Sequence, residues 1–185
     1  METNIKAFTQ ENTSGSLKLE FTRIENLRDY LFIANGVIPN SIALHEGAEL
    51  YTWEFFDGQL SFDFSEKQNN DSSFYASTVK GYIPMDKPEI KSSLEFMVNH
   101  RYLVIEVDNN GYRTVLGDVN RGCLFTFKTK HGNATQRNQY EFKFTYNSLQ
   151  APPSINPEIS TPLEVILDTN WNQEDSAVGL FQGGA

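Results

Sequence analysis

The sequence predicts an all-β protein with at most one short helix. Tyr140, Phe142, Phe144 and Tyr146 alternate without interruption, as expected for a strand with one buried face. Turn signals such as Asn110-Gly111 separate similar alternating segments. About eight or nine short strands recur at a spacing of about 8–12 residues, and no segment has sustained helical periodicity. We therefore expect an antiparallel β-sandwich or barrel.

The first 49 residues contain one clear strand. Residues 1–15 are polar and without periodicity, and we interpret them as a flexible N-terminal arm. Leu17, Leu19 and Phe21 then alternate with polar residues and predict a strand. Residues 24–34 fit a short helix or a strand followed by a loop, and we expect a loop at 35–49 because it holds glycine and proline.

The next segment predicts a hairpin. Residues 50–56 and 59–64 are rich in aromatic residues, and Asp57-Gly58 stands between them. Asp-Gly favours a type I′ turn because that turn needs positive φ at both central positions. We expect these two strands to pair and residues 65–73, which are polar, to form a loop.

The middle of the chain predicts a further strand and a second hairpin. Residues 74–83 alternate as a strand, whereas 90–99 suit a short helix or a strand. Residues 101–107 and 112–117 flank an Asn-Gly turn and should pair antiparallel.

A third antiparallel pair is expected between residues 123–129 and 139–147. The intervening residues 130–138 are polar and more numerous than a tight turn requires, so this hairpin should project.

The composition changes after residue 147. Residues 148–185 contain four prolines and one apolar strand candidate, 163–168. We therefore predict a β-domain over 16–147 and an extended C-terminal arm over 148–185. A strand on an arm needs a partner, which is an edge of its own sheet or of a neighbour's.

Charge is unevenly distributed. The net charge is −9, which argues against a protein that binds nucleic acid through an overall positive field. Residues 148–185 hold five acidic residues and no lysine or arginine, whereas 112–147 hold six basic and two acidic residues. This favours head-to-tail contacts between copies, or the arm folding back onto the hairpin, unless the charges merely alternate on a solvated surface.

No catalytic or metal-binding motif stands out. His45, His100 and His131 are scattered, and the single cysteine, Cys123, lies in an apolar strand, where a core position is expected. The longest apolar run, 31–34, is far short of the roughly 20 residues that span a bilayer. We predict a protein that is not an enzyme and that has no cofactor, no metal and no membrane partner.

Two further patterns have alternative explanations. Glu54 and Asp63, across the expected Asp-Gly hairpin, suit a carboxylate pair, but charged outward faces look the same. Trp53 and the tyrosines suit a carbohydrate-stacking surface, although alternating aromatic residues usually build a core.

Residues 101–153 carry a family resemblance. The segments RYLVIEVDNNGYRTVLGD, CLFTFKT and RNQYEFKFTYNSLQAPP, with a polar loop holding Gly132, follow the order strand, Asn-Gly turn, strand, long hairpin and proline-containing exit. This region resembles the C-terminal half of virion structural proteins from tailed phages of Bacteroidetes-type hosts. Arg137 followed by Tyr140 and the alternating phenylalanines are its best points.

The resemblance implies a subunit of the phage tail or head-to-tail connector, located in the virion and made in the host bacterial cytoplasm. Such proteins look like β-sandwiches or barrels that join edge to edge into rings and bind neighbouring virion proteins. An acidic lumen would let DNA pass without sequence-specific contact.

With this resemblance, the sequence predicts subunit contacts in the projecting loop, the basic strands around it and the arm. The candidate contact residues are Lys128, Lys130, His131, Arg137, Leu163, Val165, Leu167 and Trp171. The alternative function is a carbohydrate- or host-surface-binding β-sandwich module that uses Trp53.

Overall fold

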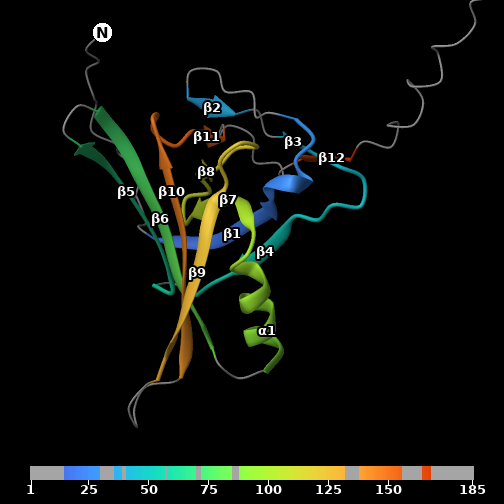
Figure 1. Ribbon diagram of the computed structural model, residues 1–185, viewed down its shortest axis with the longest axis vertical. Helices are drawn as coiled ribbons and strands as arrows, with labels where there is room; N and C mark the ends of the chain where they lie inside the picture. The colour runs from blue at the N-terminus through green and yellow to red at the C-terminus, as the bar shows by residue number, and fades with distance from the viewer. Residues whose placement is uncertain are drawn as a thin grey trace, which may run out of the picture.

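The prediction of an all-β protein with one short helix is confirmed by a computed structural model (Figure 1). The structure describes residues 15–29, 36–38, 41–56, 58–69, 72–84, 88–131, 138–155 and 164–167. The elements of the first half are β1 (Ser16–Arg23), a 3-10 turn (Ile24–Asn26), β2 (Val37–Ile38), β3 (Ser41–Leu44), β4 (Tyr51–Glu54), β5 (Leu60–Asn69) and β6 (Ser72–Pro84). Those of the second half are α1 (Pro88–Met97), β7 (Arg101–Asp108), β8 (Arg113–Leu116), β9 (Cys123–Lys130), β10 (Gln139–Ser148), β11 (Ser154–Ile155) and β12 (Glu164–Leu167).

The strands form a ten-stranded sheet in the order β2-β11-β8-β7-β9-β10-β6-β5-β1-β4, and β12 pairs with β3 separately. An additional pairing of β1 with β7 joins distant parts of this order, so six strands form a closed circuit, β1-β7-β9-β10-β6-β5. Two joints of the circuit are short: β1 meets β5 only at Ser16 and Leu60, and β7 meets β9 at two positions. Beyond these joints β1 pairs with β4, and β7 pairs with β8.

Two hydrophobic cores share strand β7. Tyr102 and Val104 pack into the larger core, with the aromatic residues of β9 and β10. Leu103 and Ile105 point to the opposite face and pack into a smaller core with residues of β2, β3, β8 and β11. This double burial explains why β7 is a continuous apolar run rather than an alternating one.

Segment 90–99, for which the sequence allowed a helix or a strand, is helical as far as Met97 and belongs to helix α1. Pro88 is its first residue, where the missing N–H costs nothing, and Glu89 lies in its first turn. Leu94 and Met97, three positions apart, are the buried residues of the helix and join the larger core. Figure 1 shows α1 beside the lower part of the sheet.

The expected hairpin across Asp57-Gly58 is wrong. A turn does form there: Gly58 has φ of 78°, and the N–H of Gln59 donates to the carbonyl of Phe56 at 3.0 Å. The flanking strands then separate, because β4 pairs with β1 and β5 pairs with β6. Glu54 and Asp63 are therefore not cross-strand neighbours, and the carboxylate pair that depended on this hairpin has no geometric basis.

Two expected loops contain strands instead. In the segment 65–73, β5 continues to Asn69 and β6 already begins at Ser72, so the two form one long hairpin. In the segment 35–49, β2 and β3 form by pairing with distant strands, β11 and β12, in parallel.

The other two expected antiparallel pairs are confirmed. β7 pairs with β8 around the Asn-Gly turn, where Gly111 has φ of 81°, and β9 pairs with β10 over seven positions. Residues 132–137 of the hairpin expected to project lie outside the described residues, as do residues 1–14 of the predicted N-terminal arm.

The segment predicted as a C-terminal arm contains two paired strands. β11 pairs with β8 and β2, and Ile155 is 1% exposed in the smaller core. β12, within the strand expected at 163–168, pairs with β3 of the same chain. The boundary between domain and arm at residue 147 stays a prediction.

Candidate functional site

Five of the eight predicted contact residues lie in described parts of the chain. Lys128 and Lys130 are on β9, and His131 follows them directly and is exposed. Val165 and Leu167 belong to β12. The remaining three, Arg137, Leu163 and Trp171, lie outside the described residues.

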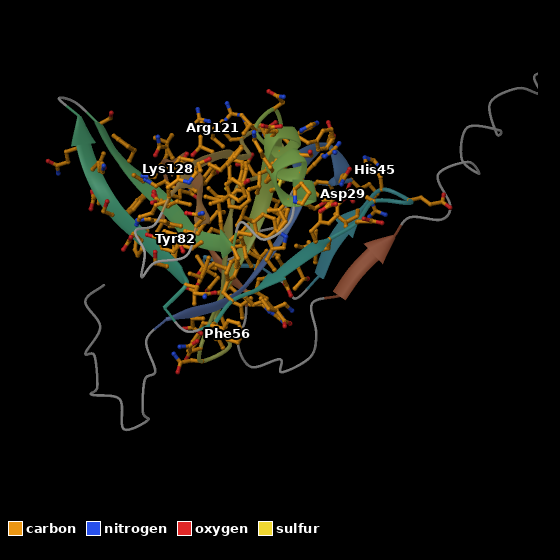
Figure 2. The ribbon with its side chains drawn as sticks, turned by 90° about the horizontal axis from the view of Figure 1, so that it is seen from below. Asp29, His45, Phe56, Tyr82, Arg121 and Lys128 are labelled. Atoms are coloured by element: carbon orange, nitrogen blue, oxygen red, sulfur yellow. The ribbon has the colours of Figure 1, made fainter. Side chains whose placement is uncertain are left out.

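The strand register brings Lys128 into a cluster from three neighbouring strands. Glu141 of β10 stands opposite Lys128 of β9 on one side and Tyr82 of β6 on the other. Two positions along, Lys143 of β10 stands opposite Lys80 of β6. We call the outward surface formed by Lys80, Tyr82, Lys128, Lys130, Glu141 and Lys143 the basic face. Figure 2 shows Tyr82 and Lys128 on the same side of the molecule.

Glu141 is the centre of the basic face. Its carboxylate, 5% exposed, lies 3.2 Å from the ammonium of Lys128, 3.7 Å from that of Lys80 and 3.8 Å from that of Lys143. Burial opposes its ionisation, but the hydrogen bond from Lys128 and the charges of the lysines outweigh burial and lower the pKa of Glu141. The carboxylate is therefore ionised at neutral pH and holds the three ammonium groups together.

Tyr82 binds two of the lysines through its ring. The ammonium groups of Lys80 and Lys130 lie 5.6 Å and 5.3 Å from the ring centroid. The hydrogen bond with Tyr82 and the charge of Glu141 raise the pKa of Lys80. With four lysines to one carboxylate, the basic face keeps a positive charge that is suited to an anionic partner.

The sequence indicated Lys128 and Lys130 but did not indicate Lys80, Tyr82 or Lys143 as members of the same surface. Lys80 and Tyr82 occupy alternate positions of the strand expected at 74–83, which places them on one face. Only the register of β6 against β10 shows that this face continues the basic residues of the β9–β10 hairpin.

A second surface lies along the outer edge of β4, the last strand of the sheet. The N–H of Phe55 donates to the carbonyl of Leu17 at 2.8 Å, which identifies the alternate residues that bond to β1. By this alternation, the backbone groups of Thr52 and Glu54 point away from β1. Among the described residues, no strand pairs with this edge.

The edge of β4 borders a hollow of about 690 Å³ between β4, the end of β6 and helix α1. Its lining includes the apolar residues Trp53, Phe55, Tyr82, Ile83 and Ile90, and Glu54 and Glu89 are its acidic members. A second hollow of about 510 Å³ shares Trp53 and Ser93 with the first and extends to Phe21, Tyr51, Phe96 and Met97. We call the two hollows together the edge groove.

The edge groove exists because two strands of the sheet diverge. β5 begins at Leu60 opposite Gly81, and the N–H of Tyr82 donates to the carbonyl of Gln59 at 3.2 Å, so the last two residues of β6, Ile83 and Pro84, extend beyond the β5 ladder. On the other side, β1 leaves β5 after Ser16 and pairs with β4. Residues of α1, among them Ile90 and Leu94, line the space that this leaves between β4 and the end of β6.

Trp53 is held by the core rather than presented as an open platform. Its ring centroid lies 4.7 Å from that of Phe21, 5.3 Å from that of Phe142 and 6.4 Å from that of Phe55. The exposed aromatic residue beside the groove is Phe56, which is 82% exposed (Figure 2). This packing suits a groove that receives apolar side chains better than a flat surface for a sugar ring.

The predicted core position of Cys123 is confirmed: the side chain is fully buried, and burial raises the pKa of its thiol. The residues that the structure describes contain no group of three or more His, Cys, Asp or Glu side chains placed to hold a metal ion. Within the same residues no helix has the length and apolar character that crossing a membrane requires. Compared with known proteins, the chain matches no protein-family model and no curated protein.

Proposed function

We propose that the chain is a structural subunit of a phage virion, in the tail or head-to-tail connector region, that assembles with copies of itself. The basic face is the observation that carries the proposal. It gathers four lysines on strands of the region that resembles virion proteins and on the adjacent β6.

A second copy of this chain can supply the acidic partner for the basic face. Residues 148–185 carry five acidic residues and no basic ones. A neighbouring copy can therefore present its acidic segment to the basic face, in a head-to-tail contact that repeats around a ring. In this proposal the ring binds neighbouring virion proteins and lets DNA pass without sequence-specific contact.

Charge reversal on the basic face should weaken self-association about tenfold at low salt, equivalent to about 1.4 kcal/mol. The variant Lys128→Glu with Lys143→Glu changes two side chains that are 65% and 42% exposed. Because both lysines contact the buried carboxylate of Glu141, circular dichroism must first show that the variant is folded. Sedimentation velocity at low and high salt measures the change. Reversing the opposite partner as well, with Glu174→Lys and Asp175→Lys, should restore association.

Lys91→Glu on α1 is the matched control, because Lys91 is 58% exposed and lies on another surface. It should associate like the unchanged chain.

Purified phage particles provide the test of the virion role. A chain that stays monomeric at high concentration and is missing from the particles contradicts the proposal, and a glycan that changes Trp53 fluorescence would support the carbohydrate-binding alternative.

A further inference from the structure

We infer that the edge groove receives residues 4–8 of a second copy as an added β-strand, an inference that rests on the proposed self-assembly. The groove offers the two features that strand addition requires. One is a row of backbone groups on β4 that point outward, at Thr52 and Glu54. The other is an apolar lining that can take alternate side chains, around Trp53 and Ile90.

The chemistry of the groove selects the segment. The side chains of Trp53 and Phe55 point to the core side of β4, whereas those of Thr52 and Glu54 are exposed on its solvent-facing side, here called the outer side. Residues 4–8 read Asn-Ile-Lys-Ala-Phe. With Ile5 and Ala7 directed to the core side, Lys6 comes to the outer side beside Glu54, where opposite charges on neighbouring strands stabilise pairing.

The other terminal segment fits less well. Residues 177–181 read Ala-Val-Gly-Leu-Phe and are also apolar, but they follow Glu174 and Asp175 and contain no basic residue. Glu54 and Glu89 at the groove would repel that acidic approach. Charge complementarity therefore favours the N-terminal segment.

The proposed self-assembly makes a second copy the donor, and the path of the chain sets how close that copy must lie. The N–H of Asn109 donates to the carbonyl of Gly15 at 2.9 Å, so the chain enters β1 beside the β7–β8 turn. β4 lies along the opposite edge of β1 from β7. Residues 9–14 span roughly 20 Å when extended, so a donor copy must be in direct contact. The same length would also reach the groove of its own chain, which the dilution experiment below distinguishes.

Proline at position 52 tests the strand addition in the full-length chain. Thr52→Pro removes an N–H that points outward and leaves the bonds to β1, because edge strands tolerate proline on their free side. Association should fall about tenfold with Thr52→Pro, while Thr52→Val, which keeps the N–H, should behave like the unchanged chain. Lys6→Glu should weaken association about threefold, and Glu54→Lys added to it should restore association.

Trp53 provides a second measurement, made at a dilution at which the chain is monomeric and no second copy fills the groove. In a chain with Trp171→Phe, Trp53 is the remaining tryptophan. A peptide of residues 1–12 should shift its emission to the blue, because the added strand excludes water, and the Thr52→Pro chain should not respond. A peptide of residues 174–185 should have no effect.

The outcomes separate the two proposals. Association that is unchanged by Thr52→Pro and Lys6→Glu overturns the strand addition and leaves the proposed function in place. A monomeric chain whose Trp53 emission responds to the peptide contradicts self-assembly but supports the groove as a strand-binding site. Without any peptide, the Trp53 emission of the full-length chain can also be compared with that of the Thr52→Pro chain. If it is shifted to the blue and stays so on dilution, the chain's own N-terminus fills the groove, which overturns the second copy as donor.

Discussion

Replacing Phe142 with alanine should lower the free energy of unfolding by about 3–5 kcal/mol, the range for deleting a buried phenylalanine ring. Phe142 is fully buried, and its ring centroid lies 5.3–6.3 Å from those of Trp53, Phe55, Phe125 and Phe144. The cavity that alanine leaves would lie under the edge groove. Urea unfolding, followed by circular dichroism, measures the loss.

Phe96→Ala is the control, because Phe96 is 55% exposed and contacts mainly Arg23 and His100. It should cost less than about 1 kcal/mol. Gly81→Ala tests the same packing from the other side, because a Cβ at Gly81 would lie 2.6 Å from the ring of Phe142. The double variant should lose less than the sum of the two single losses, whereas additive losses would contradict direct packing of these residues.

The sequence predicted those elements whose partners follow each other along the chain. The β7–β8 and β9–β10 pairs need only alternation and a turn, and both are present. The turn at Gly58 also forms, but Tyr51 and Trp53 pack on Phe21, so β1 is the partner of β4 instead of β5. A turn signal fixes local geometry, and tertiary packing decides the pairing.

Short strands with distant partners could not be predicted from local patterns. β2 and β3 contain two and four residues and pair with β11 and β12 from the C-terminal part of the chain. The polar ends of β5 and β6 could not be recognised as strands either, because a ladder of backbone hydrogen bonds can continue without apolar side chains. Such pairings carry no signature in hydrophobic periodicity.

The candidate site was predictable in the same partial way. The excess of basic residues over 112–147 indicated Lys128 and Lys130. Lys80 and Tyr82 come from a strand more than forty positions earlier, and the β6–β10 register is needed to place them beside Lys143 and Glu141. The edge groove depends on the divergence of β5 from β1 and has no local signature.

Glu106 is a buried carboxylate of β7. None of the ion pairs found among the described residues joins it to a lysine or arginine. It is 3% exposed on β7 and accepts a hydrogen bond from the hydroxyl of Ser16. Burial, and to a lesser extent the charge of Asp108, raise the pKa of Glu106 to about 7, although the hydrogen bond from Ser16 opposes the rise. Its ordinary pKa is 4.5.

Stability should therefore fall as the pH rises from about 4.5 to above 7. Below pH 4.5 Glu106 is protonated in both the folded and the unfolded chain, so it imposes no penalty. Above pH 7 the folded chain must bury a charged carboxylate, which costs about 3 kcal/mol for a shift of this size. Glu106→Gln keeps the shape and can still accept the bond from Ser16, so it should match the unchanged chain at pH 4.5 and exceed its stability by about 3 kcal/mol at pH 8.

Urea unfolding at a series of pH values measures this difference. Ser16→Ala is the companion variant: it removes the donor that favours the ionised form, so the pKa of Glu106 should rise further and the pH dependence should steepen. Stability curves of the unchanged chain and Glu106→Gln that run parallel from pH 4.5 to 8 would show that Glu106 keeps its ordinary pKa. Because Ser16 is the point where β1 meets β5 and the circuit of strands closes, ionisation of Glu106 should weaken the fold first at that joint.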